Sequence, residues 1–109
     1  MNTKNMPVVE LVLFRAKAGV SQQTLIEGTQ SIQMWLAQQP GYIRRELLMT
    51  HEGQWADLVY WNSYEEAMVA GEKFMSLPEA GPLESVMDVT TIQMFHFHQM
   101  AAFEAVPVK

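Results

Sequence analysis

The stretch WADLVYWNSYEEA, residues 55–67, contains the two features that decide the fold of this chain. Residues 55–62 are rich in aromatic and branched side chains, which is typical of a β-strand. Directly afterwards, Ser63 is followed three residues later by Glu66, the spacing of a capping box that begins a helix. We therefore expect a strand over residues 55–62 that leads into a helix ending near Leu77.

Outward from this stretch, the same signals give three more strands and one more long helix. Strands are expected over residues 8–17, 42–50 and 89–100. The other helix is expected over residues 21–39, between a capping Ser21 and the Pro40–Gly41 pair, and one helical turn is expected over residues 83–88. The order β-α-β-β-α-β is the ferredoxin-like arrangement. The predicted fold is therefore α+β, with a four-stranded antiparallel sheet and two helices on one face.

The strands carry apolar side chains on both faces, although two helices can cover only one face of a sheet. Strand 8–17 places Val9 and Leu11 on one face, and Val12 and Phe14 on the other. An antiparallel sheet with one wet face should instead alternate apolar and polar residues. A second copy of the sheet is the simplest cover for such a surface. We therefore predict a homodimer in which the open faces of two such sheets cover each other.

Length and composition narrow the class of protein. A chain of 109 residues predicts one domain over residues 1–109. The net charge is −5 and the seven basic residues are scattered, so nucleic acid is not an expected partner. The chain has no run of 18 apolar residues, no signal-peptide pattern and no cysteine. These absences predict a cytoplasmic protein without disulfides or thiolate chemistry. In the tail, residues 101–109, Phe103 and Val106 suggest docking on another surface.

Two segments carry a resemblance to a known family: PGYIRRELL, residues 40–48, and DLVYWNSYEEA, residues 57–67. With the expected strand order, they make residues 7–100 similar to the dimeric α+β barrel superfamily, and within it to the antibiotic biosynthesis monooxygenase family. That family includes cofactor-independent monooxygenases for phenolic polyketides, haem-degrading enzymes, quinol oxygenases and proteins without known activity. The resemblance implies a pocket between the sheet and the helices of each subunit.

The resemblance also has implications for single residues. The family's tryptophan at the end of the third strand matches Trp61, which implies that Trp61 binds substrate; the alternative is ordinary core packing. Haem-degrading members use an asparagine in the first strand and a histidine on the later helix. This chain has Val12 at or near the first position, and Ala70 and Gly71 at the second. Haem degradation is therefore not expected.

His96 and His98 lie two residues apart in the expected strand 89–100, so their side chains should share a face. A His-x-His pair could bind zinc, copper or iron, but a tight site needs three or four ligands. Glu10, on the neighbouring first strand, is one possible third ligand, whereas His51 lies in a distant turn. One alternative is an acid–base or substrate-orienting role. The other is two histidines at a sheet edge or dimer seam that form hydrogen bonds to backbone or water. We expect no bound metal.

Glu10 is the one acidic residue in an otherwise apolar strand. Burial between two sheets would raise its pKa and suit it to act as a general base. The alternative is a carboxylate paired with Arg44 or Arg45. The resemblance implies a monooxygenase-like protein that needs no cofactor and acts on a small aromatic or quinone-like molecule, and Glu10, His96 and His98 are its candidate catalytic residues. A non-catalytic barrel that binds a small ligand or serves a stress response is the alternative.

Overall fold

The structure is a computed structural model that describes residues 6–108, so residues 1–5 and 109 of the expected domain lie outside the described part. Each element is given by its first and last residue. The elements are β1 (Val8–Ala16), α1 (Gln22–Gln30), α2 (Gln33–Ala37), β2 (Tyr42–Met49), β3 (Trp55–Trp61), α3 (Tyr64–Phe74), the 3₁₀ helix η2 (Pro78–Ala80), α4 (Gly81–Val86) and β4 (Met87–His98).

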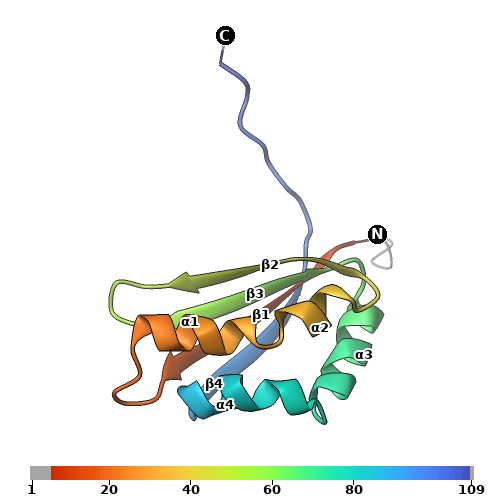
Figure 1. The fold of residues 1–109 in the computed structure, drawn as a ribbon. Coiled ribbons are helices and arrows are strands. Elements are labelled where there is room, and N and C mark those ends of the chain that lie inside the picture. The colour runs from red at the N-terminus through yellow and green to blue at the C-terminus, as the bar shows by residue number, and fades with distance from the viewer. Residues whose placement is uncertain (1–5, 109) are drawn as a thin grey trace.

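The four strands form one antiparallel sheet in the order β2-β3-β1-β4. The helices lie on one side of this sheet (Figure 1), as the ferredoxin-like βαββαβ arrangement requires. The predicted α+β fold is therefore confirmed. In the register of the central strand, Glu10 on β1 is paired with Val59 on β3 and with His96 on β4.

The single helix expected over residues 21–39 is in fact two helices, because the chain turns between Gln30 and Gln33. The Ser31 N–H bonds back three residues to the carbonyl of Gly28. The carbonyl of Thr29 accepts a 2.8 Å hydrogen bond from Nη1 of Arg45 on β2. The apolar stripe continues across the break, so the sequence pattern alone does not reveal it. The hydrogen bond at the break comes instead from Arg45, which lies far away in the sequence on β2.

The second half of the chain follows the prediction more closely. The Ser63 side chain accepts from the Glu66 N–H, which confirms the expected start of α3. The helix ends at Phe74, earlier than expected, because Ser76 and Leu77 bond back three residues in tight 3₁₀ fashion. Strand β4 begins at Met87 rather than at residue 89, and the helical turn expected over residues 83–88 is α4, which begins and ends two residues earlier, at Gly81 and Val86.

Two hydrophobic clusters hold the helices on the sheet. One surrounds Phe14 and Trp55, whose rings stack 6.5 Å apart, and the other surrounds Trp61. Gly28 allows α1 to approach α4 closely, since a Cβ atom there would lie 2.7 Å from Cγ2 of Val86. A cavity lies between the helices and the sheet.

The opposite face of the sheet is open. Phe95 and Phe97 on this face stack with ring centroids 6.0 Å apart, yet they stay 43% and 52% exposed. Beyond β4 the chain runs away from the sheet as an extended arm, residues 99–108 (Figure 1). Phe103 and Val106 on this arm are exposed, so the expected docking of the tail is not made within one chain.

Candidate functional site

The cavity between the sheet and the helices has a volume of about 560 Å³, which lies within the usual range for small-molecule sites. Its existence follows from the small residues on the inner face of α3. Ala67, Ala70 and Gly71 leave the space in front of the sheet unfilled. At Gly71, a Cβ atom would meet nothing within 4 Å. Most of the remaining wall is apolar, including Val12, Phe14, Ile32, Trp35, Leu36, Val59, Met68, Phe74, Leu83, Ile92 and Met94.

The sheet places Glu10 and His96 together in the wall of this cavity. Nε2 of His96 lies 2.7 Å from Oε2 of Glu10, and the two side chains are only 18% and 16% exposed. Burial raises the pKa of Glu10, an effect that the hydrogen bond and charge of His96 partly offset and that nearby Asp57 reinforces. A carboxylate whose pKa is raised toward neutrality is a better proton acceptor near neutral pH.

This contact corrects two expectations about Glu10. Its side chain faces the helices and the cavity, not a space between two sheets. Its hydrogen-bond partner is His96, whereas Arg45 binds Asp57 and Arg44 lies 3.8 Å from Glu46. The expected neighbourhood of β1 and β4 is confirmed by the register.

His98 shares a face with His96 but does not line the cavity. Tyr64, the first residue of α3, lies over both histidines. Its ring stacks on His98 at 6.0 Å and meets His96 edge-on at 5.9 Å. Among residues 6–108, no group of three or more His, Asp or Glu side chains is arranged to hold a metal ion, so Glu10 does not complete a site with both histidines.

Trp61 belongs to both the cavity wall and the core. The residue is 1% exposed, and the edge of Tyr42 lies against its ring at 6.1 Å. Its Nε1 atom is buried and has no hydrogen-bond partner within residues 6–108. Packing and ligand contact are therefore compatible roles for this side chain. The wall positions considered for haem chemistry, Val12, Ala70 and Gly71, offer no polar side chain.

An ion pair that the sequence pattern did not reveal forms another part of the wall. Nε and Nη2 of Arg45 donate to the two carboxylate oxygens of Asp57 at 2.8 and 2.6 Å. Nη1 of Arg45 donates to the Thr29 carbonyl and to Oε1 of Gln33. One feature of the sequence does indicate that Asp57 is buried. It lies at alternating positions of β3 with the buried Trp55, Val59 and Trp61, so its side chain points to the same face.

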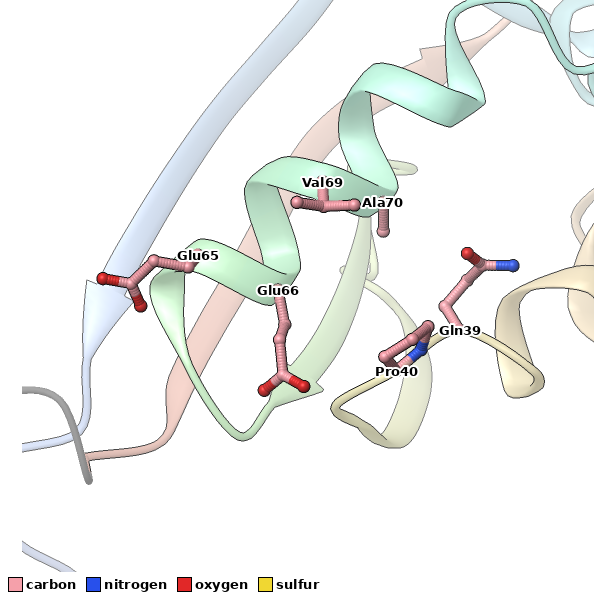
Figure 2. A pocket seen from close by; sticks show the side chains of 6 residues that line it. All are labelled: Gln39, Pro40, Glu65, Glu66, Val69 and Ala70. Atoms are coloured by element: carbon pink, nitrogen blue, oxygen red, sulfur yellow. The ribbon is translucent and has the colours of Figure 1, made fainter.

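A second, smaller hollow of about 180 Å³ lies between the start of α3 and the loop after α2 (Figure 2). Its walls are formed by Gln39, Pro40, Glu65, Glu66, Val69 and Ala70. Figure 2 shows the Glu65 carboxylate pointing away from Gln39 and Pro40. Glu66 accepts a hydrogen bond from the Ser63 hydroxyl and is already used in the helix cap. The larger cavity is therefore the better candidate site.

None of the helices in the described residues is long and apolar enough to cross a membrane. No protein-family model matches the chain, and no curated protein matches it in sequence.

Solved structures do match over nearly the whole chain. SnoaB from Streptomyces nogalater, a cofactor-independent oxygenase, is 16% identical with a TM-score of 0.66, over 94% of this chain and 99% of that one. The ActVA-Orf6 monooxygenase from Streptomyces coelicolor, solved with nanaomycin D, is 20% identical with a TM-score of 0.72, over 94% and 95%. A protein from Bordetella bronchiseptica, provisionally named an antibiotic biosynthesis monooxygenase, is 13% identical with a TM-score of 0.72, over 88% and 99%. The structural neighbours of this chain are thus antibiotic biosynthesis monooxygenase proteins, and it shares their fold.

Proposed function

We propose that the protein is a monooxygenase that needs no cofactor and acts on a small aromatic or quinone-like molecule bound in the 560 Å³ cavity. The observation that carries the proposal is the Glu10–His96 pair, a hydrogen-bonded acid–base couple in an otherwise largely apolar wall. Proteins that share this fold, among them one solved with nanaomycin D, support the choice of reaction and ligand class.

In this proposal the pair removes a proton from an activated CH or phenolic OH group of the ligand. The electron pair left behind makes the ligand electron-rich enough to react with O₂. O₂ adds at the CH₂ carbon that lost the proton, and the pair returns that proton to the peroxide to give a hydroperoxide. The hydroperoxide loses water to leave a carbonyl, so one oxygen atom enters the product and the other leaves as water. The cavity contributes orientation and exclusion of bulk water.

Two further side chains have proposed roles. Trp61 holds one face of the aromatic ligand, because its indole forms part of the same wall as Glu10. His98 is proposed as a secondary proton acceptor outside the cavity, and it contacts the same Tyr64 ring as His96 does. His98→Gln should therefore slow turnover far less than His96→Gln does.

The proposal includes a homodimer formed by the open faces of two sheets. The open face carries Phe95 and Phe97, which remain 43% and 52% exposed, and the same face of a second copy is the simplest cover for them. Phe95 and Phe97 would lie in this interface, and Phe103 and Val106 of the arm would contact the second copy.

Oxygen uptake with a panel of hydroquinones and anthrones tests the activity. The wild-type protein should consume O₂ faster than the buffer does, and Gly71→Leu should abolish this activity by filling the cavity without disturbing the core. Gly81→Leu is the matched control, because a Cβ at Gly81 also meets nothing within 4 Å but the residue does not line the cavity. Ligand binding without oxygen uptake would instead support the non-catalytic alternative.

A further inference from the structure

Acidic side chains dominate the charged part of the cavity wall. Among the described residues 6–108, four carboxylates line it, and the basic side chains that line it are Arg45 and His96. The carboxylates belong to Glu10, Asp57, Glu72 and Glu84. Glu72 and Glu84 are exposed residues of α3 and α4, so they act at the rim, whereas Glu10 and Asp57 lie deeper in the wall.

Within residues 6–108, both basic side chains of the wall already have a carboxylate partner. A guanidinium has five N–H donors, and Arg45 uses four of them: Nε and Nη2 donate to Asp57, and Nη1 donates to Thr29 and Gln33. The paired donors that would bind a carboxylate of a ligand are thus already committed to Asp57. His96 is engaged with Glu10.

We infer that these carboxylates make the cavity selective for ligands that arrive without negative charge, and that it rejects aromatic molecules carrying a carboxylate. This inference rests on the proposed function, which it deepens. A ligand anion would lose its hydration in the cavity without gaining a counter-ion, and such burial is costly. It would also meet the rim carboxylates on its way in, and like charges in contact are strongly unfavourable.

The same charges are compatible with ionisation inside the cavity. When the Glu10–His96 pair accepts a proton from a neutral ligand, the O–H or C–H bond breaks and its electron pair stays on the ligand. The total charge of the complex does not change in this step. A preformed anion, by contrast, adds one negative charge to a wall whose basic side chains, as far as residues 6–108 are concerned, already have carboxylate partners. The ligand must therefore be neutral outside and become an anion only beside the pair.

A matched pair of probes tests this selectivity. The probes are 2-(hydroxymethyl)anthraquinone, which is neutral, and anthraquinone-2-carboxylate, which is charged at neutral pH. Binding is followed by quenching of tryptophan fluorescence, since Trp35 and Trp61 line the cavity. We expect the neutral probe to bind the full-length protein at least about tenfold more tightly.

Rim variants separate the inference from a general effect of net charge. Glu72→Gln with Glu84→Gln should tighten binding of the carboxylate probe about threefold, an effect that added salt weakens, and leave the neutral probe unchanged. Glu65→Gln with Glu79→Gln makes the same charge change outside the cavity and should change neither affinity.

Equal or tighter binding of the carboxylate probe to the wild-type protein would overturn this inference alone. The inference would also be overturned if the Glu72→Gln, Glu84→Gln variant had the same ratio of affinities for the neutral and the carboxylate probe as the wild type. Failure of both probes to bind would overturn the aromatic-ligand proposal, and this inference with it.

Discussion

The Arg45–Asp57 pair offers a quantitative test of how the cavity wall is held. Arg45→Met removes two hydrogen bonds to Asp57 and those to Thr29 and Gln33, and it leaves Asp57 charged in a site where its side chain is only 12% exposed. Breaking a buried pair in this way costs about 3–5 kcal/mol in unfolding free energy. For a chain of this size, such a loss lowers Tm by on the order of 15 °C.

A second variant isolates the charge. Arg45→Met combined with Asp57→Leu removes both ions, so no uncompensated carboxylate remains. We expect the double variant to lie within about 2 kcal/mol of the wild type, because replacing a whole buried pair by apolar groups is often close to neutral. Urea unfolding followed by circular dichroism, at one fixed protein concentration, measures all three proteins. The reasoning is refuted if the single variant loses under about 1 kcal/mol, or if the double variant is as unstable as the single one.

Three further predictions concern the cavity, the open face and pH. Trp61→Phe should cost about 1–2 kcal/mol in stability and weaken ligand binding much more; a clear stability loss with unchanged binding in the same preparation would contradict the wall role. Phe97→Glu should convert a dimer of twice 12.4 kDa into a monomer by light scattering, whereas Met34→Glu, on an exposed helix position, should not; a monomeric wild type would contradict the interface. Because the pKa of Glu10 is raised above 4.5, the folded state favours its protonated form, and this stabilisation is lost as pH rises through the raised pKa. Glu10→Gln should therefore resist urea better than the wild type at about pH 8 but equally at about pH 4; a variant that is less stable at pH 8 would contradict this.

The sequence was sufficient to predict the fold because its local signals agree with one another. The Ser63 cap, the apolar strands and the stops at Pro40 and Gly41 all point to one element order. Helix boundaries were less predictable, since a residue of strand β2, Arg45, donates a hydrogen bond to the Thr29 carbonyl beside the break after Gln30. Periodicity within a segment cannot contain that information.

Part of the site was predictable for the same reason. The ferredoxin-like topology makes β1 and β4 neighbours, so the sequence predicts that Glu10 and His96 lie on adjacent strands. The sequence could not show which sheet face they occupy or which partner Glu10 has, because both depend on register. Asp57 has the parity of the buried residues of β3, but its ion pair becomes visible only when β2 is placed beside β3.

The central claim is that the Glu10–His96 pair takes a proton from a ligand bound in the cavity. The most direct test is the absorbance spectrum of an anthrone bound under anaerobic conditions, where ionisation can occur but reaction with O₂ cannot. The account predicts that the wild-type protein binds the ligand as its anion at neutral pH, and that Glu10→Gln and His96→Gln bind it in the neutral form. A bound ligand that stays neutral in the wild type, or that ionises equally in both variants, would contradict the account.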